Sequence, residues 1–195
     1  MTKKILSLIA VLGASVAPIA HAETTGEPTT YTVVLAGGSA QNMIHIWLTP
    51  GGTEYAIDSV VPLEVGGPVC HNAPGNQNEL LCQAPLVAGF VVVAGPGDDS
   101  VSVAGSVRVP TTLNGGPGRD LLQGGSGADK LVGGTGNDVL SGKAGNDAIF
   151  GGPGKDVLNG GPGNDVLWGG PGHDVMHPGS GHDGLHEGTG RGPRR

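Results

Sequence analysis

A nine-residue unit is repeated eight times without insertion between Gly115 and His186, and this period constrains the fold more than any other feature of the chain. Asp occupies the sixth position of every copy, and an apolar residue occupies the eighth. A fixed period of this kind is typical of a solenoid, in which each copy stacks on its neighbours. Glycine makes up 39 of the 195 residues, which without order would favour a flexible linker, but the strict period argues against one. The copies read GGPGRDLLQ, GGSGADKLV, GGTGNDVLS, GKAGNDAIF, GGPGKDVLN, GGPGNDVLW, GGPGHDVMH and PGSGHDGLH.

Within each copy, the first six positions have the chemistry of a turn and the last three that of a short strand. Glycines permit positive φ angles and close backbone approach, and they leave carbonyl oxygens free to point at an ion. The Asp at position six supplies a hard oxygen ligand, and calcium prefers about six to eight such oxygens from carboxylates and carbonyls. In the strand, position eight points inward and positions seven and nine point outward. The pattern therefore predicts an all-β fold with cation sites in its turns.

These repeats resemble the RTX (repeats-in-toxin, haemolysin-type) calcium-binding family, strongly over Gly115–His186 and weakly over Gly95–Val103. The resemblance implies a parallel β-roll in which two repeats form one coil of eighteen residues. It also implies several calcium ions between successive turns, held by turn carbonyls and by Asp side chains one coil apart. Lys143, Ala144 and Pro178 depart from the repeat, which puts the sites beside those turns in doubt.

Carried over residue by residue, the resemblance assigns candidate calcium ligands of three kinds. One side of the roll stacks Asp120, Asp138, Asp156 and Asp174, and the other stacks Asp129, Asp147, Asp165 and Asp183, with Asp99 in the weaker unit. Asn137, Asn146 and Asn164 at position five would add carbonyl capacity or ease the turn. The glycine candidates are Gly116, Gly118, Gly125, Gly127, Gly134, Gly136, Gly145, Gly152, Gly154, Gly161, Gly163, Gly170 and Gly172.

Two imperfect copies precede the regular array. Gly95–Val103 reads GPGDDSVSV and stands out of phase, because Asp99 lies twenty-one residues before Asp120 rather than eighteen. Three extra residues must therefore bulge within Ala104–Thr112, in a degenerate coil. Gly37–His45 reads GGSAQNMIH, with Asn42 where the repeat has Asp, and is a candidate for a decayed coil with a weak or absent ion site.

The segment before the repeats is predicted to be β-rich, with no helical period after the first residues. Runs rich in Val, Ile and aromatic residues, separated by Gly, Pro and Asn, predict strands over residues 31–36, 43–48, 54–61 and 86–94. Cys70 and Cys82 are the only cysteines, and in an exported chain an even pair favours a disulfide. A free thiol pair or a metal site is the alternative.

The first residues have the pattern of a secretory signal peptide. Lys3 and Lys4 precede an apolar stretch over Ile5–Ala17, and Ala20-His21-Ala22 fits the small-residue rule for cleavage before Glu23. An uncleaved membrane anchor is the alternative, and no later stretch could span a bilayer as a helix. We therefore expect general secretory export and four segments: a signal peptide over 1–22, a β-rich region over 23–94, the β-roll over 95–186 and a flexible tail over 187–195.

The net charge indicates which classes of partner the chain can bind. Removal of the leader takes Lys3 and Lys4 with it, which lowers the formal net charge from −7 to −9. Nucleic-acid binding needs a basic patch, so an acidic chain of this kind is not expected to bind nucleic acid, whereas it suits cations.

Position nine sorts into two outward columns when two repeats form a coil. One column is polar, and the other is apolar and aromatic at Val132, Phe150 and Trp168. An exposed apolar column can mark a surface for a protein or cell-surface partner, or the N-terminal half or a loop can cover it. The histidines of the last two copies lie in turns on opposite sides and on opposite sheets, which argues against one four-histidine metal site: His173, His177, His182 and His186.

The sequence therefore predicts a secreted calcium-binding protein whose repeats fold into a β-roll on binding calcium. Ordering nine residues costs more conformational entropy than the burial of one leucine returns, so metal-free repeats should be largely unfolded. The alternative is a calcium-dependent adhesion or interaction module at the cell surface. An enzyme is not expected, because the chain has no HExxH, GxSxG or Walker motif.

Overall fold

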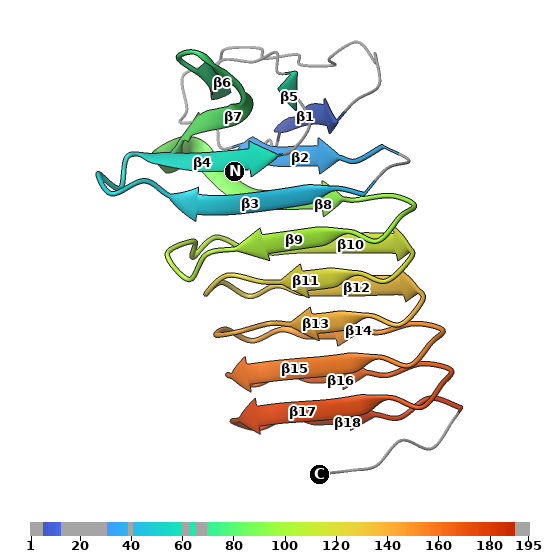
Figure 1. Cartoon of the computed structure of the whole chain (residues 1–195). Coiled ribbons are helices and arrows are strands. Elements are labelled where there is room, and N and C mark those ends of the chain that lie inside the picture. Colours follow the sequence, from blue (N-terminus) through green and yellow to red (C-terminus); the bar gives the residue numbers. More distant parts are fainter. Residues whose placement is uncertain (1–5, 13–30, 39–40, 60–62, 65–69, 190–195) are drawn as a thin grey trace.

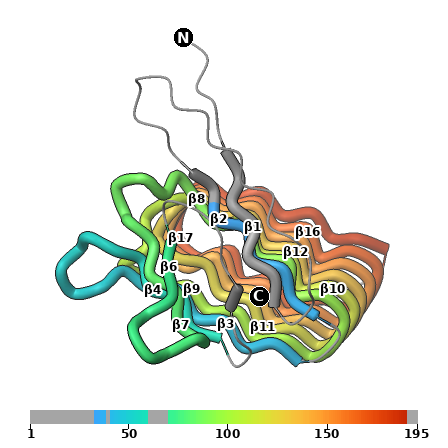
Figure 2. Tube along the Cα trace, turned by 90° about the horizontal axis from the view of Figure 1, so that it is seen from above, coloured from blue at the N-terminus to red at the C-terminus, as the bar shows by residue number. Residues whose placement is uncertain are grey.

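The computed structural model describes residues 6–12, 31–38, 41–59, 63–64 and 70–189. Over these residues the chain is all β, with eighteen strands in two nine-stranded sheets and one 3-10 turn, η1 (Ala84–Leu86). The strands stack along one axis in Figure 1, and Figure 2 looks down that axis on the superimposed coils. The predicted all-β class and parallel β-roll are confirmed.

Strands of the repeats alternate between the two sheets. One sheet contains β8 (Val87–Val93), β10 (Thr111–Pro117), β12 (Lys130–Thr135), β14 (Ala148–Phe150), β16 (Val166–Trp168) and β18 (Gly184–His186). The other contains β9 (Ser100–Val103), β11 (Leu121–Gln123), β13 (Val139–Ser141), β15 (Val157–Pro162) and β17 (Val175–Ser180). In each sheet, parallel pairing places Leu122 beside Leu140, and Leu131 beside Ile149. Two repeats therefore form one coil, as predicted.

Position eight of the repeat fills the core between the sheets. Side chains from Leu122 to Leu167 at this position are fully buried, and Met176 is 8% exposed. Leu185 is the exception at 44% exposed, because β18 is the last strand of its sheet and only one neighbour covers it. Position seven points outward as predicted, since Leu121 and Val139 are 40% and 44% exposed.

The three extra residues lie where the phase of the repeat predicted them. Val101 and Leu113 are both fully buried core residues, but twelve residues separate them in the sequence instead of nine. The intervening loop folds Val107 inward, and the Val107 N–H donates to the Ala104 carbonyl at 3.0 Å. The loop stays in the stack, because the Ser126 N–H of the next turn donates to the Val107 carbonyl at 2.8 Å.

The N-terminal end continues the same two sheets. There β2 (Tyr31–Ala36) pairs in parallel with β8, and β3 (Met43–Leu48) pairs in parallel with β9. Beyond β3, the strands β4 (Glu54–Ser59), β7 (Asn76–Gln83) and β6 (Cys70–Ala73) add in antiparallel order. The parallel roll therefore changes to an antiparallel sheet at this end (Figure 1).

The strands predicted for the N-terminal end agree in part with the structure. The bounds predicted for β2 and β3 agree with the structure, and β8 is one residue shorter at each end than the predicted 86–94. The strand β4 covers the described part of the predicted 54–61, because residues 60–62 lie outside the described residues. The β6–β7 hairpin was not predicted. Its pairing sets Cys70 opposite Cys82, and the two form a disulfide, as predicted.

A further strand lies within the segment predicted to be a leader. The strand β1 (Leu6–Leu12) pairs in parallel with β2 and in antiparallel with β5 (Leu63–Glu64). The predicted cleavage site at 20–22 falls outside the described residues. Among the residues that are described, no helix is long and apolar enough to cross a membrane.

Candidate metal centre

Two columns of turns run along the roll, one on each side of the stacked strands (Figure 1). The Asp120 column is the set of turns that contain Asn42, Asp99, Asp120, Asp138, Asp156 and Asp174. The Asp129 column is the set of turns that contain Thr111, Asp129, Asp147, Asp165 and Asp183. The structure therefore keeps the predicted Asp residues in two separate stacks and adds one residue to the head of each.

One oxygen of each aspartate joins neighbouring coils. The backbone N–H of Asp120 donates to Oδ1 of Asp138 at 2.9 Å, and the same bond recurs down both columns at 2.8 to 3.0 Å. At the heads of the columns, the backbone N–H groups of Asn42 and Thr111 donate in the same way to Asp99 and Asp129. The Oδ1 atoms therefore link each coil to the next in a fixed register.

The second oxygen has no partner at most of these positions. Oδ2 is buried without a hydrogen bond in Asp99, Asp120, Asp138, Asp147, Asp156 and Asp165. Buried polar atoms in folded proteins almost always have a partner, and a buried charge is paired or coordinates a metal. Four of these oxygens lie in the Asp120 column and two in the Asp129 column, and their chemistry suits cations between the coils.

Burial also changes the acidity of these groups. Desolvation raises the pKa of Asp120, Asp147 and Asp156 to about 6, although a backbone hydrogen bond to each carboxylate opposes the rise. Neighbouring carboxylates in the same column add to it, as Asp138 does for Asp120. The charged form is therefore costly in these turns unless a cation is present.

Glycines at positions two and four set the backbone oxygens beside these carboxylates. Gly134 and Gly136 have φ of 114° and 144°, a region that favours glycine. A Cβ on Gly134 would lie 2.0 Å from the Gly116 carbonyl oxygen, and one on Gly136 would lie 1.5 Å from that of Gly118. These carbonyls therefore point along the column into the space between successive turns.

Carbonyls at positions one and three have another use. The N–H groups of Gly134 and Gly136 donate to the carbonyls of Gly151 and Pro153, each at 3.0 Å. Position one must also be glycine where the carboxylate packs against it, since a Cβ on Gly133 would lie 2.5 Å from Asp138 Oδ2. The carbonyls of positions one and three therefore bond the neighbouring turn, and the carbonyls of positions two and four face the space between the turns.

The donor set suits a hard cation. No group of three or more His, Cys, Asp or Glu side chains that could hold a metal occurs in the described part of the chain. An ion between the turns would therefore be held by main-chain carbonyls together with the Oδ2 atoms. Oxygen ligands of this mixed kind, in a flexible backbone frame, fit calcium better than zinc or other metals that prefer nitrogen and sulfur.

A comparison with protein families agrees with this geometry. The model described as the RTX calcium-binding nonapeptide repeat (4 copies) matches three overlapping stretches, residues 114–149, 132–167 and 150–185. Residues 114–185 are an RTX calcium-binding repeat array. The matches leave out the N-terminal end of the roll, including the turn of Asp99. No curated protein and no solved structure gives a significant match to this chain.

Position-five asparagines of the RTX array have a structural use. Oδ1 of Asn137 accepts from the Lys155 N–H, and Oδ1 of Asn146 and Asn164 accepts from the N–H groups of Asn164 and His182, all at 2.9 Å. These amide oxygens lie on the exposed rim of the turns and link them one coil apart.

Departures from the RTX repeat have unequal effects. In the last coil, Pro178 does not interrupt the ladder, since the Asp165 N–H still donates to Asp183 Oδ1 at 2.9 Å. Lys143 keeps a left-handed backbone, with φ of 75°, although it is not glycine. The turn one coil before Lys143 also differs from the others, because Oδ2 of Asp129 accepts a hydrogen bond from the Gly125 N–H at 2.7 Å.

The sequence predicted most residues of the two aspartate columns but not Thr111, at the head of the Asp129 column. Asn42 was expected to replace an Asp, and its buried side chain donates to the Ala94 carbonyl and to Asp99 Oδ1 at 3.1 and 3.0 Å. Thr111 was not expected to belong to the ladder, yet its N–H and Oγ1 both bond Asp129 Oδ1 at 2.8 Å. The missed signal is phase, because Thr111 lies eighteen residues before Asp129.

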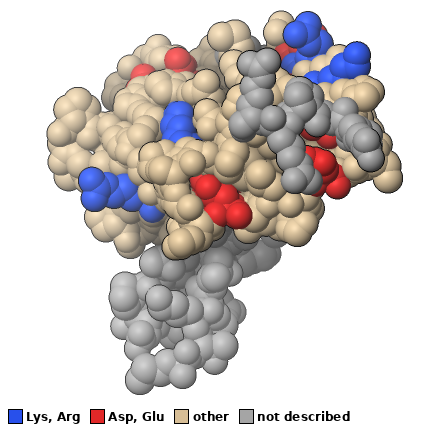
Figure 3. Space-filling model, turned by 90° about the horizontal axis from the view of Figure 1, so that it is seen from below, with Lys and Arg blue, Asp and Glu red and all other residues tan. Residues whose placement is uncertain are grey.

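The outward columns also follow the prediction. Phe150 stacks on Trp168 with ring centroids 4.4 Å apart, and Trp168 stacks on His186 at 5.0 Å. His177 lies on the other sheet, in β17, so these histidines do not converge on one site. From the C-terminal end, Figure 3 shows acidic and basic atoms scattered among uncharged ones, consistent with the burial of most ladder carboxylates.

Proposed function

We propose that this chain is an exported calcium-binding protein whose RTX array folds on binding several calcium ions. The observation that carries the proposal is the row of buried, unpartnered Oδ2 atoms in both columns of turns. Without cations these carboxylates lie close together in a poorly solvated place, which opposes folding. Calcium would neutralise them and bind the carbonyls of positions two and four, so binding free energy becomes folding free energy.

We expect calcium to supply the stability that the small apolar core of the array lacks. Each repeat except the last buries a single apolar side chain, at position eight, and the commonest residue of the ordered turns is glycine, which loses the most backbone entropy on folding. Hydrogen bonds between coils exist only once both coils are formed. The ion is the part that can bring two turns together and stabilise both.

Circular dichroism of the full chain tests this proposal. Adding calcium to chelator-treated protein should increase the β signal cooperatively, and the same concentration of magnesium should not, because magnesium requires a smaller and more regular octahedral site. Identical spectra with calcium and with chelator would contradict the proposal.

A pair of variants at adjacent positions localises the effect. Asp138→Asn removes a buried carboxylate oxygen from the Asp120 column and should weaken calcium-induced folding by roughly tenfold or more in calcium concentration, for loss of a charged ligand. Asn137→Ser at the exposed rim is the control and should shift the midpoint far less. Equal midpoints for the two variants would show that the buried oxygen is not a ligand.

Export is part of the same proposal and rests on the leader pattern at the N-terminus. Amino-terminal sequencing of the protein recovered from a secreting host should begin at Glu23. Recovery of a chain that begins at Met1 would contradict cleavage.

A calcium-dependent interaction module is the second candidate function. It is favoured by the stacked Phe150–Trp168–His186 column, which stays partly exposed on its sheet. The described N-terminal strands extend this sheet and do not lie over its face (Figure 2). Comparing wild type with Trp168→Ser in a cell-surface binding assay, with and without calcium, separates the two candidates, since simple calcium binding does not need this side chain.

A further inference from the structure

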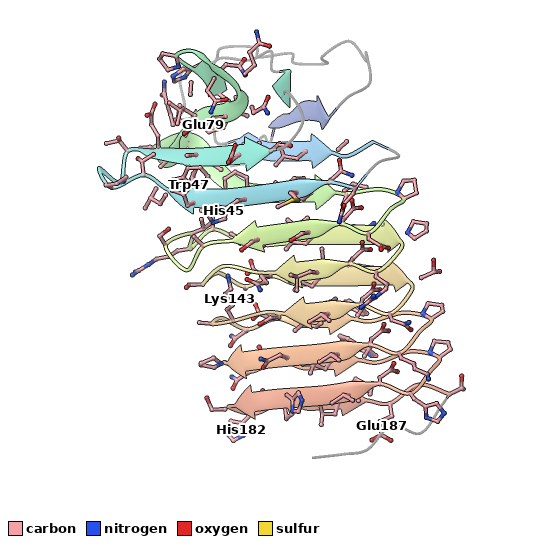
Figure 4. All side chains as sticks on the ribbon, viewed as in Figure 1. His45, Trp47, Glu79, Lys143, His182 and Glu187 are labelled. Carbon is pink, nitrogen blue, oxygen red and sulfur yellow. A yellow bond between two sulfur atoms is a disulfide. The ribbon has the colours of Figure 1, made fainter. Side chains whose placement is uncertain are left out.

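Lys143 reaches across two coils inside the Asp129 column. It occupies position two of its repeat, where the other seven copies have glycine. Its side chain is partly buried, and Nζ donates to the carbonyl of Val103 at 2.5 Å, forty residues earlier in the chain. Figure 4 shows Lys143 on the side of the roll opposite the Asp120 column, close below the loop that follows β9.

Asp129, in the turn one coil before Lys143, differs from the ladder aspartates whose Oδ2 has no partner. Asp129 is buried, but Oδ1 accepts from the N–H and Oγ1 of Thr111, and Oδ2 accepts from the Gly125 N–H. Its neighbour Asp147, one coil further on, has an Oδ2 without a partner. The Asp129 carboxylate therefore lacks the unpartnered oxygen found in six other turns of the two columns.

Lys143 and Asp129 also interact as charges. Burial raises the pKa of Asp129, while hydrogen bonds from Thr111 and Gly125 and the charge of Lys143 lower it. Burial lowers the pKa of Lys143, and the Asp129 charge opposes that change. An opposite charge at this position does what a bound cation would do for a buried carboxylate.

The backbone gives an independent sign that this lysine is held in place. A φ of 75° is unfavourable for a residue with a side chain, and Lys143 is the only non-glycine residue with positive φ in the described part of the chain. Strain of this kind persists where surrounding contacts determine the conformation. Lys130 and Lys155 have no comparable contact: one lies over the Phe150 ring and the other is exposed on a turn.

We propose that the ammonium group of Lys143 replaces a calcium ion at the N-terminal end of the Asp129 column. The turn of Asp129 is then neutralised by the chain itself, and calcium sites in this column begin at the turn of Asp147. The inference rests on the proposed calcium-dependent folding of the array, and it makes the two columns unequal in the number of ions that they bind.

Calcium titration calorimetry on three full-length variants tests this inference. Lys143→Gly restores the residue of the other copies and should bind one more calcium ion than wild type, with a steeper dependence of the melting temperature on calcium concentration. Lys143→Met fills the same space without charge, so it should gain no ion and melt roughly 5 °C or more below wild type in saturating calcium. Lys155→Met, a lysine exposed on a turn of the other column, is the control and should match wild type in both measurements.

Two results would overturn the inference. One is an unchanged ion count in Lys143→Gly, and the other is a melting temperature of Lys143→Met equal to that of Lys155→Met. If wild type binds no calcium at all, the proposed function fails, but the loss of stability in Lys143→Met relative to Lys155→Met still reports whether this ammonium neutralises Asp129.

Discussion

The N-terminal end of the roll and the RTX array share two sheets but depend on different interactions. Residues 31–113 contain many of the buried apolar side chains, with Tyr55 packed edge-on against Phe90 at 5.2 Å and a disulfide across β6 and β7. The array contributes one buried apolar side chain in each repeat except the last, and two columns of buried carboxylates. One part is stabilised like an ordinary small domain, and the other has little apolar core and, under the proposed function, depends on cations.

The heads of the two columns lie where these parts meet. Asn42 supplies a neutral amide where the Asp120 column would continue, and Thr111 with Lys143 supplies bonds and a charge where the Asp129 column would continue. Under the proposed function, both substitutions would reduce the need for an ion at the same end of the roll. The contrast teaches that the period alone does not decide which turns need an ion, because single residues at the boundary can supply its charge or its bonds.

The largest expected effect is a difference in hydrogen-exchange protection between the two regions. Removal of calcium should abolish hydrogen-exchange protection over residues 115–186 and leave much of the protection of residues 31–103, because most of the proposed cation sites lie in the array. Hydrogen exchange followed by mass spectrometry, with calcium and with chelator, measures both regions in one sample. Uniform loss of protection from both regions would break the comparison.

Reduction of the disulfide provides the opposite perturbation. Opening the Cys70–Cys82 bond should lower the stability of the N-terminal end by about 2–4 kcal/mol and leave the calcium midpoint of the array close to its original value. A large shift of that midpoint on reduction would mean that the two parts fold as one unit.

Much of the array could be read from the sequence, because its structure is a set of relations between positions eighteen residues apart. The RTX resemblance, which implies two repeats per coil, predicted the stacking of Asp120 on Asp138, and the repeat pattern and its phase predicted the burial of Leu122 and the bulge after β9. The N-terminal end has no period, so the antiparallel order of β4, β7 and β6 depends on contacts that no local pattern encodes. The contact from Lys143 to Val103 was missed for the same reason, since it crosses two coils.

A second expected effect is on pH, and it differs in sign between metal-free and calcium-loaded protein. Burial raises the pKa of Asp120, Asp147 and Asp156 from 3.8 to about 6, so the folded array binds more protons than the unfolded chain between these values. Stability of the metal-free array from these groups is therefore present below pH 4 and is lost as the pH rises through about 6. Calcium binds the ionised carboxylates, so its affinity should rise over the same interval.

Circular dichroism at pH 4.5 and pH 7, with chelator and with calcium, measures both trends. We expect more β structure at pH 4.5 than at pH 7 in chelator, and a calcium midpoint several-fold lower at pH 7 than at pH 4.5. A metal-free array that gains structure as the pH rises would contradict the assignment of these carboxylates as unpaired in the fold.

The smallest expected effect is at the head of the Asp120 column. Asn42→Asp would exchange an amide that donates to the Ala94 carbonyl and Asp99 Oδ1 for an acceptor facing two acceptors. Without calcium this should destabilise the N-terminal end by about 1–3 kcal/mol, since buried acceptors lose their donor and two carboxylates come together. Calcium should recover part of that loss, because the substitution restores the Asp of the repeat, and Ala94→Gly on the same coil should show no such recovery. Chemical denaturation of the two variants with and without calcium tests the point: if calcium recovers nothing in Asn42→Asp, the head of this column is closed to metal by its shape and not by the missing charge.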